Sequence, residues 1–298
     1  MEFIDKSRGQ QQAHTLLNAF LLRCRDESFN TSEDLYEKMG SGRDLSDPTA
    51  ENTKVILKRQ LLQENNGRCC YCMRSIDENN TTLEHIIPNK IPSQKEYDLY
   101  QPFFPKHIWQ NMVFAGYFLS NPRWPFRAYP HTIAYENLIP SCDGKFARSS
   151  SPTLHSRDDR ESKCCNNKRG SKFVIPFVLN QQMVSEIKYK SDGYVVWPVT
   201  DNSIQGEERK RLLLIHKNTI DNLNLNCPEL VAIRRIWNFL TSLGQDCTKD
   251  NQGRTILFLT EDPSLSLEEE EMLKNFWSDN YWCLLEEYRY FNDRNKFV

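Results

Sequence analysis

The feature that most constrains this chain is a cysteine-rich central segment, from Arg68 to Gly170. It holds six of the ten cysteines and four of the six histidines, together with many prolines, and it has little long hydrophobic periodicity. Such a segment cannot rely on an extended apolar face, so we expect a bound metal to brace it. Because no export signal is apparent, the cysteines favour metal binding or reactive thiols over a disulfide framework.

Composition limits the classes of function. The chain has 298 residues, 39% of them hydrophobic, which predicts one large or two modest domains with a real core. No run approaches the roughly 18 apolar residues of a membrane span. The formal net charge is −2, so no bulk positive field indicates nucleic-acid binding. We expect a cytoplasmic protein without a membrane partner.

The segments before and after this centre are more regular. Apolar spacing predicts a helix over 13–24, and Asp47-Pro48 reads as the N-cap and first residue of a second helix that stops at Gly67. After Gly170, residues 186–197 predict a hairpin around an Asp-Gly turn. Further helices are expected to begin at Pro228 and Ser266. The fold class predicted is α+β, helical towards both ends.

The cysteines of the centre have the spacing of metal ligands. Cys69 and Cys72 form a C-x2-C turn that lets two thiolates share one tetrahedral ion. Cys142, with either Cys164 or Cys165, could complete the site. The alternative is that these are small buried hydrophobic residues. We expect structural zinc.

Polar residues with catalytic chemistry lie between and beside these cysteines. Glu84 and His85 fall in a short apolar run, and Asn137 and Asn166 flank the second cysteine pair. Carboxylate and amide oxygens suit a magnesium-type ion. A neutral imidazole can take a proton from water. Alone, such a histidine is more often structural than catalytic.

Taken in order, these pieces resemble the HNH (ββα-metal) endonucleases. The shared pattern is C-x2-C, an acidic residue before His-Ile-x-Pro, Asn-Leu, Cys, and then Cys-Asn followed by basic residues. The resemblance implies a hairpin and a helix that hold one divalent cation, Mg²⁺ or Mn²⁺, and hydrolysis of a phosphodiester bond. It implies a small core braced by zinc.

The resemblance also assigns roles to residues. His85 would be the general base, Glu84 and Asn166 the ligands of the catalytic cation, and Asn137 the residue that orients the histidine loop. Asn167 is an alternative to Asn166, as Cys164 is to Cys165. The preferred zinc ligands are Cys69, Cys72, Cys142 and Cys165.

Two insertions distinguish this chain from compact members of that family, at about 89–135 and 143–163. The expected organisation is therefore an N-terminal helical region over 1–66, a nuclease core over 67–175 with both insertions, and a C-terminal hairpin and helical region over 176–298. The first insertion is rich in aromatic residues, which could form a stacking platform for bases beside Arg123 and Arg127. The interpretation we favour is a small inserted core.

Basic residues follow the last motif position. Lys168, Arg169 and Lys172 could neutralise phosphates that flank the cleaved bond, or could simply be solvated. We predict these three residues as candidate nucleic-acid contacts.

A downstream stretch, Thr219–Asn226 followed by Glu229-Leu230 and Arg234, resembles the PtuB-like branch of these nucleases from Septu and some retron antiviral systems. This resemblance implies a role in antiphage defence with an ABC-type ATPase partner that controls the nuclease. DNA is the expected substrate. The alternatives are an RNA-cleaving effector, for instance one that cuts tRNA, and a catalytically silent zinc module that binds nucleic acid or a partner.

Overall fold

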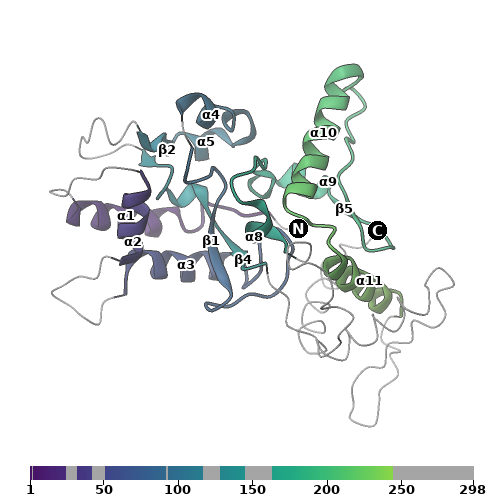
Figure 1. Cartoon of the computed structure of the whole chain (residues 1–298), viewed down its shortest axis with the longest axis horizontal. Coiled ribbons are helices and arrows are strands. Elements are labelled where there is room, and N and C mark those ends of the chain that lie inside the picture. The colour runs from purple at the N-terminus through teal and green to yellow at the C-terminus, as the bar shows by residue number, and fades with distance from the viewer. Residues whose placement is uncertain are drawn as a thin grey trace, which may run out of the picture. The chain divides into compact units, whose positions relative to one another are not determined.

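The fold is mixed α+β, mostly helical with small two-stranded sheets, as the sequence predicts (Figure 1). The computed structural model describes residues 1, 3–24, 32–41, 51–91, 93–116, 128–144 and 163–243. The helix expected from Ser266 lies outside this range. None of the helices within it combines the length and the apolar character needed to cross a membrane.

The chain divides into two compact units. Unit 1 comprises residues 1–143 and 169–185, and unit 2 comprises residues 144–168 and 186–298. Unit 1 therefore joins the expected N-terminal helical region to most of the expected nuclease core.

Three helices open unit 1: α1 (Gln10–Arg23), α2 (Ser32–Ser41) and α3 (Thr53–Glu64). The helix predicted from Asp47 begins later than expected. Asn52 is its N-cap, in an extended conformation, and its side-chain oxygen accepts a hydrogen bond from the Val55 N–H at 2.9 Å. The predicted N-cap was wrong because a second capping residue follows Asp47 and its side chain closes the first turn.

The predicted stop of this helix at Gly67 is confirmed. Asn66 and Gly67 both have positive φ angles, of 52° and 62°. The Gly67 N–H reaches back to the Leu62 carbonyl at 2.8 Å. This bond satisfies a carbonyl of the last turn and ends the helix.

The central element of unit 1 is an antiparallel pair of strands, β1 (Thr81–His85) and β4 (Leu138–Cys142). Thr81 pairs with Cys142 and His85 with Leu138. Two strands alone are only marginally stable in water. Here α3 packs against both strands and every residue of β4 is buried, so the pair belongs to the core of the unit.

The described part of the first insertion is a set of short elements. They are α4 (Gln94–Asp98), η1 (Gln101–Phe103), α5 (Lys106–Trp109), β2 (Met112–Val113), β3 (Tyr129–Pro130) and η2 (Tyr135–Asn137). Strands β2 and β3 pair in parallel. The Tyr97 ring lies 4.6 Å from the Trp109 ring, and Tyr97, Tyr100, Phe104 and Tyr129 are buried.

The burial of these four side chains favours the inserted core over a stacking platform. The remaining members of the aromatic and basic group lie outside the described residues: Tyr117, Phe118, Arg123, Trp124, Phe126 and Arg127.

The chain after the second insertion starts with α8 (Cys165–Arg169), whose last residue belongs to unit 1, and continues with η3 (Phe177–Leu179) and α9 (Gln181–Glu186). Unit 2 then holds the predicted hairpin, as β5 (Lys188–Tyr189) and β6 (Val195–Val196). Two longer helices follow, α10 (Gly206–Asn222) and α11 (Pro228–Leu243), and the predicted start at Pro228 is confirmed.

Candidate active site and metal centre

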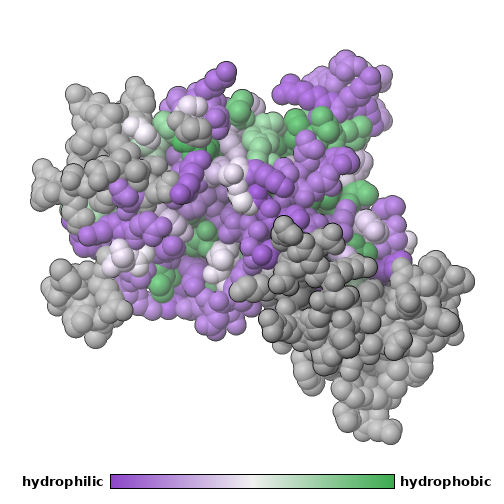
Figure 2. All heavy atoms as spheres, in the orientation of Figure 1, coloured by the Kyte–Doolittle hydropathy of each residue, from purple (hydrophilic) through white to green (hydrophobic). Residues whose placement is uncertain are grey.

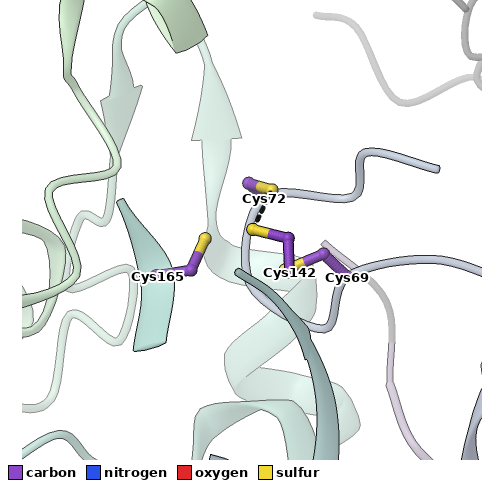
Figure 3. A group of neighbouring side chains, drawn as sticks. All are labelled: Cys69, Cys72, Cys142 and Cys165. Carbon is purple, nitrogen blue, oxygen red and sulfur yellow. Dashed lines mark hydrogen bonds between the residues drawn. The ribbon is translucent and has the colours of Figure 1, made fainter. Parts of the chain in front are cut away.

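Four cysteines from three distant stretches converge at one point (Figure 3). Cys69 and Cys72 lie in the turn before β1, Cys142 ends β4, and Cys165 begins α8. Their sulfur atoms all lie within 4.8 Å of one another, and Cys72 Sγ is 3.8 Å from Cys142 Sγ.

This geometry fits a zinc ion. A tetrahedral site with Zn–S bonds of about 2.3 Å has sulfur–sulfur edges of about 3.8 Å. All four side chains are buried, with at most 3% of each residue exposed. Thiolates are the ligands that closed structural zinc sites use. The predicted four-cysteine cluster is therefore confirmed as a site that could hold zinc.

The local backbone explains how the C-x2-C turn presents its sulfurs. The Met73 N–H bonds to the Cys69 carbonyl at 3.0 Å, and Met73 adopts a positive φ of 68°. The Cys70 N–H donates to the Pro140 carbonyl of β4 at 3.0 Å. This bond ties the turn to the strand that ends in Cys142.

The structure separates Cys164 from Cys165. Only Cys165 belongs to the converging group. The Cys164 thiol instead hydrogen-bonds to Cys227, and this contact, together with burial, raises the pKa of Cys227. The preference for Cys165 as the fourth ligand is thus supported by the position of its sulfur.

Glu84, the expected cation ligand, faces α8. Its buried carboxylate forms an ion pair with the Arg169 guanidinium, which also donates to the backbone carbonyls of His85, at 2.6 Å, and of Ile86. Burial raises the pKa of Glu84, and Arg169 partly offsets this effect. Asn166 and Arg169 are three residues apart on α8 and so share a face of that helix.

The prediction that Arg169 contacts phosphate is wrong, because the side chain is buried and cannot reach a nucleic acid at the surface. Only 1% of the residue is exposed, whereas the expectation was a surface cation. The physical reason is the buried carboxylate of Glu84, which requires a charged partner. Lys168 is half-buried and Lys172 is exposed, so these two remain open to solvent.

The residues present do not fit a catalytic cation held by Glu84 and Asn166. The carboxylate that would bind the cation is already paired with Arg169. Within the described ranges, the four cysteines are the only group of three or more His, Cys, Asp or Glu residues that converge on a point.

His85 ends β1, and its imidazole is fixed by a backbone carbonyl. Nε2 lies 2.8 Å from the Thr132 oxygen. A carbonyl only accepts, so Nε2 carries the proton of the neutral ring and Nδ1 keeps a lone pair. Burial lowers the pKa of His85 to about 4, and the positive charges of Lys54 and Arg169 lower it further. The hydrogen bond to the Thr132 carbonyl acts in the opposite direction and raises the pKa. The ring is therefore neutral at pH 7.

Asn137 closes the loop that follows β1. Its side-chain oxygen accepts from the Ile87 N–H at 2.7 Å, and its amide donates to the Ile87 carbonyl at 2.9 Å and to the His131 carbonyl at 2.8 Å. All three bonds are buried. One side chain thus joins the histidine loop to the segment that carries Thr132, the acceptor for His85.

Three further residues, which the sequence did not indicate, form hydrogen bonds around η2 and the start of β4. The carboxylate of Glu136 accepts from Gln10 at 2.7 Å and lies 2.8 Å from His14 Nε2. Lys6 donates to the Leu138 carbonyl, and burial lowers the pKa of Lys6 to about 8. The partners are more than 120 residues apart in the chain, and no local pattern could have paired them.

Comparison of the sequence with models of known protein families and with curated proteins finds no match.

Proposed function

We propose that this chain is an endonuclease of the HNH class that hydrolyses phosphodiester bonds of nucleic acid, with DNA as the preferred substrate. One observation carries the proposal. Two antiparallel strands are followed by a helix that begins at a candidate zinc ligand. A neutral histidine and a buried asparagine lie together at the end of the strand pair where β1 ends and β4 begins.

His85 supplies the base in this proposal. Its Nδ1 lone pair takes a proton from water, and the hydroxide attacks phosphorus as the bond to the leaving oxygen breaks. The Thr132 carbonyl holds the ring, and it stabilises the imidazolium that forms because Nε2–H donates to it. Asn137 positions the loops that carry both residues.

The divalent cation remains a separate expectation. Mg²⁺ or Mn²⁺ would supply positive charge at the scissile phosphate. The pairing of Glu84 with Arg169 does not fit a cation bound there, so we assign no step to it.

We propose further that the nuclease works in antiphage defence under the control of an ABC-type ATPase. The resemblance of the 219–234 segment to the PtuB-like branch supports this. A surface feature of unit 2 agrees with a protein partner: Leu213 and Leu214 on α10 are 42% and 57% exposed. The net charge of −2 agrees with a chain that does not hold its substrate alone.

The second candidate function is a catalytically silent zinc module. The Glu84–Arg169 pair favours this alternative, because a carboxylate that is neutralised by a buried arginine stabilises the fold and is not free to bind a catalytic cation.

The test is cleavage of DNA and of RNA by the full chain, alone and with the ABC-type ATPase, with Mg²⁺, with Mn²⁺ and without added cation. We expect His85→Ala to lower the cleavage rate by about 10²-fold or more, as loss of a general base does. His107→Ala, at an exposed position on α5, is the matched control and should cleave at the wild-type rate.

Equal cleavage by wild type and His85→Ala would refute the assigned base. No cleavage of either nucleic acid under any condition would favour the silent module. Faster cleavage of RNA than of DNA would leave the assigned active site unchanged and show that RNA is the substrate.

A further inference from the structure

A cavity of about 550 Å³ lies beside His85 in unit 1. Its walls come from α2, from the first turns of α3 and from β1. The lining residues include Tyr36, Glu37, Asn52, Lys54, Lys58 and Leu83. Figure 2 shows that the visible face of this part of the molecule is mostly hydrophilic. None of these six residues belongs to the proposed active site.

The cavity shares a wall with the proposed active site. The Tyr36 ring, which lines the cavity, meets the His85 ring edge-on, with centroids 4.5 Å apart and planes at 73°. Leu83 is two residues before His85 on β1, so both side chains lie on the same face of the strand, roughly 7 Å apart along it. The Tyr36 ring therefore contacts both the cavity and the His85 ring.

The charges of the cavity favour an anion. Lys54 and Lys58 are one turn apart on α3 and both line the space, against one carboxylate, that of Glu37. The Lys54 ammonium lies 4.1 Å from the centre of the Tyr36 ring. Burial lowers the pKa of Lys54, Glu37 opposes this, and the neighbouring Lys58 adds to it. The Lys58 ammonium donates to the Glu78 backbone carbonyl at 2.6 Å, which leaves two of its N–H groups for a ligand.

The helix end adds to this preference. The first turn of α3 contains no acidic residue, and Asn52 and Lys54 of that end line the cavity. The partial positive charge of a helix N-terminus stabilises anions. The cavity thus combines a helix N-terminus with two ammonium groups beside a proposed general base.

We propose that this cavity binds a phosphodiester group of the nucleic-acid substrate next to the one that is cleaved, through Lys54 and Lys58. The inference rests on the proposed nuclease function and names where the substrate strand lies. Direct phosphate contacts from these lysines make binding depend on salt.

The experiment measures binding separately from cleavage. Fluorescence anisotropy follows a labelled oligonucleotide, single- or double-stranded, on the full chain, alone and with the ABC-type ATPase. No divalent cation is added, and a series of salt concentrations is used. Lys54→Gln with Lys58→Gln should weaken binding at least 10-fold. It should also reduce the slope of log affinity against log salt by about 0.7–0.9 for each lost contact.

Three variants make the result specific. Lys95→Gln, at an exposed position on α4, removes one charge elsewhere in unit 1 and should bind as the wild type does. Lys54→Arg retains the charge and should bind within about 2-fold. His85→Ala should bind normally and fail to cleave. Circular dichroism confirms that each variant is folded.

The outcomes separate the two proposals. Wild-type cleavage with unchanged binding in the double lysine variant overturns the cavity assignment and leaves the nuclease intact. Binding that depends on the lysines in a chain that never cleaves supports the cavity and removes the activity. A wild type that binds no oligonucleotide, either alone or with the ABC-type ATPase, overturns both. If inorganic phosphate displaces the oligonucleotide at equal concentration, the site binds small anions and the nucleic-acid assignment fails.

Discussion

A buried arginine that pairs with Glu84 is the most consequential single contact near the proposed active site. Arg169 satisfies the carboxylate and two backbone carbonyls of the loop that follows β1. A buried charge left without its partner is far more costly than an intact pair. The contact therefore stabilises the histidine loop whether or not the chain cleaves nucleic acid.

We predict that Arg169→Met lowers the free energy of unfolding by about 3–5 kcal/mol, because Glu84 is left charged and buried. The double variant Glu84→Gln with Arg169→Met should recover part of this loss. Urea unfolding followed by circular dichroism measures both.

The control for this prediction is the exposed ion pair of Arg59 with Glu51, whose side chains are 40% and 45% exposed. Arg59→Met should cost at most about 1 kcal/mol, since solvent screens such pairs. A similar effect at Arg169 and at Arg59 would contradict the structural role of the buried pair.

His131 predicts a pH dependence of stability. Its ring is fully buried, its Nδ1 accepts from the Ala115 N–H at 3.0 Å, and burial lowers its pKa from 6.5 to about 3. The unfolded chain therefore binds the proton first as the pH falls. The contribution is complete above pH 6.5 and is lost between pH 6.5 and 3, by up to about 1.4 kcal/mol per pH unit.

The measurement compares urea unfolding at pH 7 and pH 5 for the wild type and His131→Gln. The variant should show the shallower dependence on pH. His107→Gln, at an exposed position, should keep the wild-type dependence. Equal slopes for all three proteins would show that His131 does not titrate on unfolding.

At the scale of elements, the zinc cluster joins the turn before β1, the end of β4 and the start of α8. We predict about one zinc per chain by elemental analysis. Removal of zinc by a chelator should destabilise unit 1 by several kcal/mol, on the order seen when structural zinc is withdrawn from small domains. Thermal unfolding with and without the chelator measures this.

Cysteine variants discriminate between the candidate ligands. Cys142→Ser and Cys165→Ser should lose the zinc. Cys227→Ser, at a buried cysteine outside the cluster, should retain it. If Cys164→Ser loses zinc and Cys165→Ser does not, the ligand assignment is wrong.

Several elements could be predicted from local patterns, and others could not. The hairpin at 188–196 follows from its Asp-Gly turn, and the stop of α3 follows from Gly67. The sequence analysis predicted no helix at α2, yet Leu35 and Met39 are one turn apart and both are buried. That spacing was the available signal.

The candidate site was predictable to a similar extent. The four cysteines follow from ligand spacing and from the resemblance. The partner of Glu84 does not, because Arg169 lies 85 positions away and only the packing of α8 brings the two side chains together. A motif specifies which residues carry chemistry, but it does not specify the neighbours that neutralise them.

At the scale of the whole molecule, the exposed leucines of α10 predict a partner surface. If the proposed ABC-type ATPase is the partner, Leu213→Ser with Leu214→Ser should weaken its association at least 10-fold and leave the stability of the chain unchanged. Size-exclusion chromatography of the mixed proteins gives the readout.

The matched control is Leu99→Ser in unit 1, where the leucine is 57% exposed, as Leu214 is. It should leave the complex intact. Loss of binding from Leu99→Ser alone would place the partner surface on unit 1 and contradict the prediction.

The zinc cluster also has a consequence for how this chain tolerates added length. A zinc ion bound by the four cysteines would close residues 73–141 and 143–164 into two rings of polypeptide. The entropy of closing a flexible ring rises only with the logarithm of its length, by about 0.6 kcal/mol for each doubling. Lengthening or shortening either ring therefore changes the free energy of ring closure by at most about 1 kcal/mol. Ring closure by a metal would therefore let the chain accommodate longer or shorter segments between these ligands at a small cost in closure entropy.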